Sequence, residues 1–241
     1  MSPGDLFISD VHLSHRSADR QAALAGFLRR QARGASRLFI LGDLFNAWIG
    51  RKQLAEPYVA ETADRLLELT RGGVEVHFVA GNRDFYGLAA IARRTGMVTH
   101  KSGFTVESLG RKVWVCHGHE LYAHDRRTHL AQAVTHSRPV EFLFQSLPAK
   151  LATFLARGYE NHSSRVVRHK TRRELTIPET TLVELFEAGH DDVICGHTHR
   201  LVHATYRWDG REGHLWNLGS WQDEPHFLRH GQDGWHFHRL G

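Results

Sequence analysis

The chain has 241 residues, of which 41% are hydrophobic and 24% are charged, a composition typical of a folded globular protein. This excludes a disordered, collagenous or membrane-spanning polypeptide, and the length fits one large domain or one domain with an inserted lobe. The formal net charge of +5, with 20 histidines counted as neutral, favours acidic partners such as nucleic acid, phosphorylated metabolites or an anionic membrane surface.

The N-terminal sequence "MSPGDLFISD" enters a strand-like segment directly, without a basic region and an apolar core, so we expect no export signal. The sequence also has no run of about 18 uncharged apolar residues that could span a membrane. Cys116 and Cys195 each end an apolar strand-like run, and burial explains them better than a disulfide. We therefore expect a protein of the reducing cytoplasm.

Five short apolar runs each stop at a cluster of Gly, Asp or His and predict buried strands: "LFIS", "RLFIL", "VEVHFVA", "KVWVCHG" and "DDVICGH". Helical patterns over 18–33 and 58–71 separate the first of them and predict a βαβαβ arrangement. From Leu201 onward, short strand-like segments between Gly or Pro turns predict a second, mostly antiparallel sheet. The expected fold class is α/β, with two sheets face to face and helices outside.

A segment at 125–174 interrupts this pattern, because it is helical in character and is divided by Pro139 and Pro148. We interpret it as an inserted helical lobe, so that 1–124 and 175–241 form the core. Residues 120–174 hold ten Lys or Arg against five acids, which is the whole formal charge surplus. The apolar residues of the lobe fit its own core and a surface facing a ligand or membrane equally well: Phe142, Leu143, Phe144, Leu147, Leu151, Phe154 and Leu155.

Polar clusters stand at or just after the ends of the predicted strands, where the carboxyl ends of neighbouring strands meet on one rim of an α/β sheet. Each cluster alone is typical of a turn or a cap, but together they supply four imidazoles, two carboxylates and an amide oxygen. Nitrogen and oxygen ligands without thiolate suit manganese, iron or zinc. Seven ligands are too many for one ion, so we predict two ions that share a carboxylate. The candidate ligands are Asp10, His12, Asp43, Asn82, His117, His197 and His199.

In this order, the clusters "SDVHLSH", "LGDLFN", "AGNRD", "CHGHE" and "CGHTHR" resemble the calcineurin-like metallophosphoesterase superfamily over most of the chain outside the lobe. The resemblance implies a two-sheet β-sandwich flanked by helices, two Mn²⁺ ions with iron or zinc as alternatives, and a hydroxide between the ions as the nucleophile. The metal sets that it implies are Asp10, His12 and His199, then Asn82, His117 and His197, with Asp43 bridging the two.

Arg83 stands where superfamily members that cleave phosphate esters carry a histidine, which protonates an alkoxide leaving group. A guanidinium does not give up a proton at working pH, but it can hold phosphate oxygens and stabilise charge in the transition state. This exchange suits a leaving group that is already acidic, such as a phosphate released from a pyrophosphate. Arg83 therefore predicts phosphoanhydride cleavage, with Asn82 and His117 as further catalytic residues.

Within the superfamily, "DVHLS", "GDLFNAWIG" and "GNRDF" resemble the UDP-2,3-diacylglucosamine pyrophosphatases of lipid A biosynthesis. This resemblance implies a nucleotide-lipid substrate, cleavage to UMP and 2,3-diacylglucosamine 1-phosphate, and peripheral contact with the inner face of the cytoplasmic membrane. "HGHE", Asn46 and "NHSSR" depart from the family pattern, and the roles of His119 and Asn46 stay open. The implied substrate contacts are Asn82, Arg83, Asp125, Asn161, Arg165 and His197.

Two alternatives to this function stay open. One is a phosphoesterase for soluble nucleotide pyrophosphates, phosphodiesters or nucleic acid, which the positive charge favours. Nucleic acid is the weaker partner, because the basic residues of the lobe alternate with aliphatic ones instead of lining an aromatic groove. The other alternative is a metal-dependent scaffold without activity, and the complete set of ligands argues against it. The sequence indicates no obligate protein partner.

Overall fold

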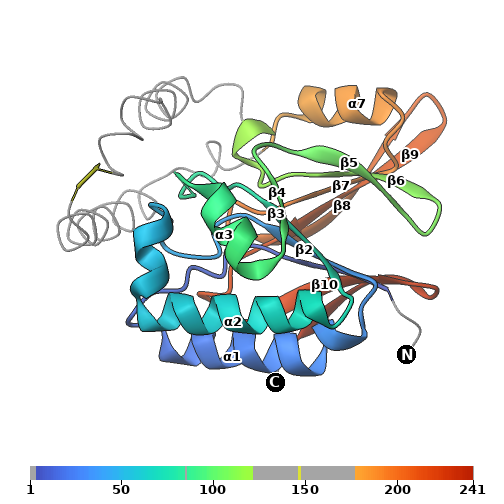
Figure 1. Cartoon of the computed structure of the whole chain (residues 1–241). Coiled ribbons are helices and arrows are strands. Elements are labelled where there is room, and N and C mark those ends of the chain that lie inside the picture. Colours follow the sequence, from blue (N-terminus) through green and yellow to red (C-terminus); the bar gives the residue numbers. More distant parts are fainter. Residues whose placement is uncertain (1–3, 85, 122–145, 148–176, 241) are drawn as a thin grey trace.

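Two β-sheets lie face to face, and helices cover their outer sides (Figure 1). The computed structural model describes residues 4–84, 86–121, 146–147 and 177–240. The predicted lobe therefore lies outside the described residues, except for Ser146 and Leu147, and its substrate contacts Asp125, Asn161 and Arg165 lie outside them as well. Among the described residues, no helix is both long enough and apolar enough to cross a bilayer.

The first sheet has six strands in the order β11-β10-β1-β2-β3-β4. Its parallel strands are β1 (Asp5–Ile8), β2 (Arg37–Leu41), β3 (Glu75–Val79) and β4 (Val98–His100). Strand β10 pairs antiparallel with β1, and β11 pairs antiparallel with β10; they span His226–Gly231 and Gly234–Arg239. The helices between the parallel strands are α1 (Ala18–Arg30), α2 (Pro57–Arg71) and α3 (Leu88–Thr95), with short 3₁₀ turns η1 (Ala32–Gly34) and η2 (Arg51–Ala55).

The second sheet has five strands in the order β5-β6-β7-β9-β8. Strands β6, β7 and β9 are parallel, while β5 and β8 pair antiparallel at its two edges. Helix α7 covers the outer face of this sheet, and a 3₁₀ turn, η3, follows β6. The bounds are β5 (Phe104–Ser108), β6 (Arg111–Val115), η3 (His119–Leu121), α7 (Glu179–Glu187), β7 (Asp192–Cys195), β8 (Leu201–Trp208) and β9 (Arg211–Leu218).

The alternation of side chains along each central strand explains why these runs are apolar throughout. Phe7 and Phe39 point into the space between the sheets, where their rings stack 4.7 Å apart. Leu6 and Leu38, their neighbours in sequence, point the other way and pack against the helices. On α1, Phe27 follows Leu24 by three residues, which is the helical spacing of a single buried face. Both faces of the central strands are therefore covered.

The prediction of a separate sheet from Leu201 onward is wrong for two of its strands. Strands β8 and β9 join the second sheet, but β10 and β11 extend the first. All six residues of β10 are buried, and Phe227 packs toward the helices while Leu228 packs between the sheets. A place beside β1 supplies apolar neighbours on both faces of β10, which an edge of the second sheet does not.

The remaining strand predictions are confirmed, and so are the helices expected at 18–33 and 58–71, although α1 ends at Arg30 and passes into η1. Strands β4 and β5 and helices α3 and α7 were not predicted. The fold class is confirmed: an α/β protein whose two sheets are flanked by helices. Cys116 and Cys195 are free and buried, as expected.

Candidate metal centre

All the predicted metal ligands lie in loops that follow the carboxyl ends of parallel strands. The two sheets bring these ends together, so residues far apart in sequence approach within a few ångströms. Asp10 and His12 follow β1, Asp43 follows β2, Asn82 follows β3, His117 follows β6, and His197 and His199 follow β7. The rim that was expected from the strand pattern is therefore formed by loops of both sheets.

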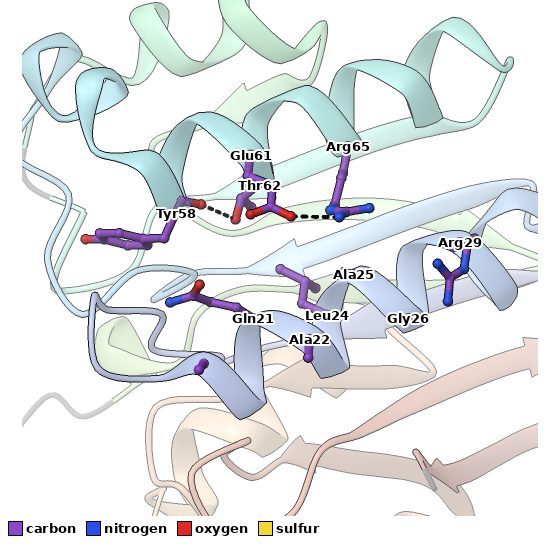
Figure 2. A pocket seen from close by; sticks show the side chains of 11 residues that line it. Gln21, Ala22, Leu24, Ala25, Gly26, Arg29, Tyr58, Glu61, Thr62 and Arg65 are labelled. Atoms are coloured by element: carbon purple, nitrogen blue, oxygen red, sulfur yellow. Dashed lines mark hydrogen bonds and ion pairs between the residues drawn. The ribbon is translucent and has the colours of Figure 1, made fainter.

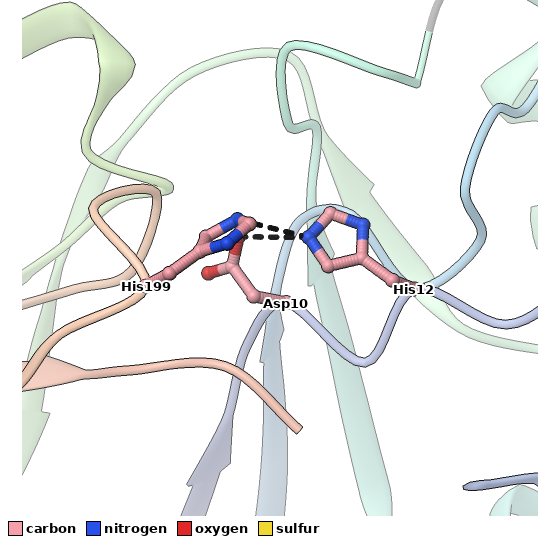
Figure 3. Close-up of side chains that lie close together, drawn as sticks. All are labelled: Asp10, His12 and His199. Carbon is pink, nitrogen blue, oxygen red and sulfur yellow. Dashed lines mark hydrogen bonds and ion pairs between the residues drawn. The ribbon is translucent and has the colours of Figure 1, made fainter. Parts of the chain in front are cut away.

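One group of donors consists of Asp10, His12 and His199 (Figure 3). Asp10 Oδ1 lies 3.5 Å from His12 Nε2 and 3.3 Å from His199 Nε2, and the two Nε2 atoms are 3.0 Å apart. Two ligands that each lie about 2.1 Å from one ion are separated by roughly 3.0–3.5 Å in tetrahedral or octahedral geometry. Asp10 Oδ1 is buried without a hydrogen-bond partner, so this group fits a cation.

A second group is centred on the amide oxygen of Asn82. This atom lies 2.9 Å from His117 Nε2 and 2.9 Å from His197 Nδ1. His117 Nδ1 donates to the Leu41 carbonyl oxygen at 2.7 Å, which leaves a lone pair on Nε2 for a metal. The separations again match those of ligands that share one ion.

Asp43 lies between the two groups. Its Oδ1 is 3.8 Å from His117 Nε2, and its Oδ2 is 4.0 Å from His12 Nε2. Each carboxylate oxygen therefore faces a different group, which is the arrangement that a bridging ligand needs.

Five of the candidate ligands have a left-handed backbone, which costs energy for residues other than glycine. Such outliers persist only where the surrounding structure enforces them, and they gather at functional sites. Here they turn successive side chains of short loops toward the same point. The φ angles are 51° at Asp10, 53° at His12, 51° at Asp43, 70° at His197 and 59° at His199.

Gly81 precedes Asn82, and Gly196 precedes His197. At both positions another candidate ligand comes so close that only glycine fits. A Cβ atom at Gly81 would lie 2.3 Å from Asp43 Oδ1, and one at Gly196 would lie 2.2 Å from Asp10 Oδ2. The "AGN" and "CGH" sequences therefore pack one ligand loop directly on the side chain of another.

Two buried side chains that sequence reasoning missed hold the ligand loops. Ser9 Oγ lies 2.6 Å from Asp10 Oδ2, which also accepts the backbone N–H of His197 at 2.8 Å. Asp84 Oδ2 accepts the N–H groups of Asp43 and Gly81, at 2.9 and 2.8 Å. Both residues are polar and adjoin a candidate site residue, a signal that was present in "SD" and "RD".

The charges around the site favour a bound cation. Burial alone would raise the pKa of Asp10, but the adjacent imidazoles of His12 and His199 hold it well below its usual range. Burial lowers the pKa of His12. Asp10 is thus ionised and His12 neutral at pH 7, the forms that bind metal. Burial opposes a charge on His117, yet Asp43 and Asp10 raise its pKa, so the site attracts positive charge.

Arg83 lies beside this centre and is only 3% exposed. Its Nε is 3.4 Å from Asp43 Oδ2, and its Nη1 is buried without a hydrogen-bond partner. The buried Trp48 donates its backbone N–H to the Arg83 carbonyl oxygen at 2.8 Å, so the "DLFNAWIG" segment supports the arginine. Arg83 Nε therefore contacts the carboxylate of Asp43, while Nη1 can donate to a ligand.

His119 lies at the second group of donors, with its ring centre 5.4 Å from that of His117 and 6.1 Å from that of His197. Among the described residues, two groups of carboxylates and histidines lie close enough to hold one ion, and His119 belongs to neither: Asp10, His12 and His199, and Asp10, Asp43 and His117. Asn46 donates its backbone N–H to the Leu13 carbonyl oxygen at 2.9 Å, which joins the loops after β1 and β2.

A cavity of about 430 Å³ between α1 and α2 contains none of these residues (Figure 2). On the α2 wall, the Thr62 hydroxyl donates to the Tyr58 carbonyl oxygen at 2.7 Å and Arg65 pairs with Glu61 at 2.7 Å; on the α1 wall, Gln21 donates to the Ser14 carbonyl oxygen at 2.6 Å. Apart from Gln21 and Arg29, the α1 wall consists of small or aliphatic residues, and none of its lining residues is a nucleophile or a metal ligand. The chemistry therefore belongs to the strand ends.

Comparison with known proteins identifies the family. The model of the calcineurin-like phosphoesterase family matches residues 6–201. A UDP-2,3-diacylglucosamine hydrolase of Stenotrophomonas maltophilia is 35% identical over 95% of this chain and 96% of its own. One of Aeromonas hydrophila is 32% identical over 92% of each chain. Vacuolar protein sorting 29 of Cryptosporidium parvum, with a TM-score of 0.51 and 13% identity over 99% of this chain and 92% of its own, shares the fold.

The scaffold alternative is thereby excluded, since the sequence relatives are enzymes that cover nearly the whole chain. The superfamily that the five clusters indicated is confirmed. This protein belongs to the calcineurin-like phosphoesterase family and is a hydrolase.

Proposed function

We propose that this enzyme hydrolyses the pyrophosphate of UDP-2,3-diacylglucosamine to UMP and 2,3-diacylglucosamine 1-phosphate, a step of lipid A biosynthesis. The observation that carries the proposal is Arg83, which is buried against the bridging carboxylate with Nη1 unpaired. The substrate named for the relatives agrees with it, because that substrate is a diphosphate.

Arg83 acts on the diphosphate as a fixed cation. Its unpaired Nη1 donates to a phosphate oxygen, and its contact with Asp43 holds the guanidinium in one orientation. Water supplies the new P–O bond, and the bond from phosphorus to the bridging oxygen breaks. The departing phosphate is a weak base and needs no proton from the enzyme, so an arginine serves where a histidine would be required for an alkoxide.

The donor atoms favour two divalent cations, and we propose Mn²⁺, with iron or zinc as alternatives. When bound, the cations would lower the pKa of water and offset charge on the phosphate oxygens. Asp10 and Asp43 are the only carboxylates in the donor groups found among the described residues, so the loaded site keeps a positive charge that suits a diphosphate. Asn82, His117 and His197 form the wall at which we place the attacked phosphate.

The acyl chains of the substrate belong to a bilayer, so we propose that the enzyme works in the cytoplasm, in peripheral contact with the inner membrane. The lobe at 125–174 is our candidate for that contact: we propose that its apolar residues receive the acyl chains and that Asp125, Asn161 and Arg165 contact the substrate. These assignments rest on the sequence and on the resemblance.

The test is UMP release from UDP-2,3-diacylglucosamine by the Mn²⁺-loaded enzyme, measured beside UDP-glucose and an aryl phosphodiester. We expect strong preference for the acylated substrate, and loss of its turnover in Asp43→Asn. Arg65→Gln changes an arginine of α2 that pairs only on the helix surface, and it serves as the matched control with unchanged turnover. Equal or faster cleavage of the unacylated compounds would overturn the substrate and favour soluble nucleotides or phosphodiesters.

A further inference from the structure

A second cavity, of about 480 Å³, lies at the opposite end of β1 from the metal centre. Gly4 and Leu6 line it at the start of β1, whereas Asp10 follows the carboxyl end of the same strand. The other walls are the carboxyl end of α1, the side of β10 that faces the helices, and the end of β11 at His238 and Arg239. The cavity is therefore separate from the site described above.

The lining of this cavity is positively charged. Arg30, Arg229 and Arg239 line it, and none of its lining residues is Asp or Glu. Arg229 Nη1 pairs with Asp233 at 2.9 Å and Arg239 Nε with Glu224 at 3.1 Å, but both acids are mostly exposed and lie outside the cavity. The pair of Arg239 and Glu224 is exposed on both sides and contributes little, whereas in the other pair only the Asp233 carboxylate is exposed and Arg229 is buried.

Arg30 stands in the last turn of α1, where a cation compensates the helix dipole. This explanation covers Arg30 alone. It does not apply to Arg229, which lies on β10 and not on α1. Arg229 is only 9% exposed, and burying a guanidinium costs free energy.

A histidine adds a second observation. His238 Nε2 is buried and has no hydrogen-bond partner, which is uncommon for a polar atom that water does not reach. Its ring stacks on Phe227, with centroids 5.0 Å apart and planes at 16°, so the ring is held in place. Phe227 and His238 both line the cavity and offer it a flat aromatic wall.

We propose that this cavity binds a phosphomonoester, with its phosphate at Arg30 and Arg229 and its organic part against Phe227 and His238. Its volume of about 480 Å³ falls within the usual range for small-molecule sites and exceeds what a phosphate ion alone occupies. The shared chemistry is a dianionic phosphate on a ring-bearing group, which a nucleoside monophosphate and a sugar phosphate both supply.

The experiment is equilibrium dialysis of the Mn²⁺-loaded enzyme against UMP, glucose 1-phosphate and inorganic phosphate, one at a time. We expect one of the two phosphomonoesters to occupy a site whose affinity falls at least tenfold in Arg30→Gln and in Arg229→Gln, the two arginines at which the phosphate is placed. These residues lie far from the catalytic residues, so metal-dependent hydrolysis is retained in both variants. The matched control is Arg33→Gln, which removes a charge from the neighbouring turn η1 but not from the cavity.

Three results would overturn the proposal. The first is no binding of either phosphomonoester at about 10 millimolar, on the order of the weakest useful affinity. The others are binding that Arg30→Gln and Arg229→Gln leave unchanged, and an equal loss of affinity in Arg33→Gln. Preference for inorganic phosphate would reject the organic part of the ligand. Dialysis measures binding without turnover, so its outcome stands whether or not the proposed substrate is correct. Phosphate bound at the metal centre is identified separately by its loss in Arg83→Ala.

Discussion

Replacing Asp84 by alanine should remove the hydrogen bonds that hold two loops of the metal centre. The carboxylate accepts the N–H groups of Asp43 and Gly81, and all three residues are buried. A buried donor left without a partner costs about 1–3 kcal/mol, so the two together cost about 2–6 kcal/mol of the free energy of unfolding. For a chain of this length each kcal/mol lowers Tm by about 2–4 °C, and we expect a loss on the order of 10 °C.

Asparagine at the same position provides the control. Its single amide oxygen can accept both N–H groups, as one carboxylate oxygen does now. Burial and the neighbouring Asp43 also raise the pKa of Asp84 to about 7, so the fold does not depend on a full charge there. Asp84→Asn should therefore keep most of the stability that Asp84→Ala loses.

The assay is thermal unfolding of the metal-free proteins, followed by titration with Mn²⁺. We expect Asp84→Ala to bind Mn²⁺ more weakly than Asp84→Asn, because Asp43 and the loop of Asn82 lose their common anchor. The reasoning is refuted if Asp84→Ala has the same Tm as the wild type, or if Asp84→Ala and Asp84→Asn lower Tm equally.

Three further predictions concern single residues. Arg83→Ala should lower turnover by about 10²–10³-fold and leave the metal content unchanged, because it removes a phosphate contact and not a metal ligand. UMP release measures the turnover and elemental analysis the metal content, and loss of metal would contradict the proposed phosphate contact. Gly81→Ala should weaken Mn²⁺ binding, because a Cβ at this position would lie 2.3 Å from Asp43 Oδ1. Calorimetric titration measures the Mn²⁺ affinity, and an affinity equal to that of the wild type would exclude this clash. Burial raises the pKa of the Cys116 and Cys195 thiols, so a thiol reagent at pH 8 should label neither until the protein is unfolded, and rapid labelling of the native protein would show them to be accessible.

The sequence by itself determined most of the strands and the kinds of atom that follow them, although β4 and β5 were not predicted. An apolar run that ends in "GD", "GN" or "GH" predicts both a buried strand and a donor at its carboxyl end, because each signal lies within a few residues. The meeting of these donors followed from the common direction of parallel strands. The role predicted for Arg83 followed from the family resemblance and from chemistry together: ester-cleaving members carry a histidine at this position, and a guanidinium cannot act as the acid that an ester requires.

Only the tertiary structure decided which strand lies beside which. Strand β10 reads as an ordinary strand, and its place next to β1 depends on apolar surface that β1 offers on both faces. The roles of Asp84 and Ser9 depend in the same way on where the amide of Asp43 and the carboxylate of Asp10 come to lie. Side-chain type and periodicity are local properties of a chain, whereas hydrogen-bond partners and neighbouring strands are set when distant segments pack together.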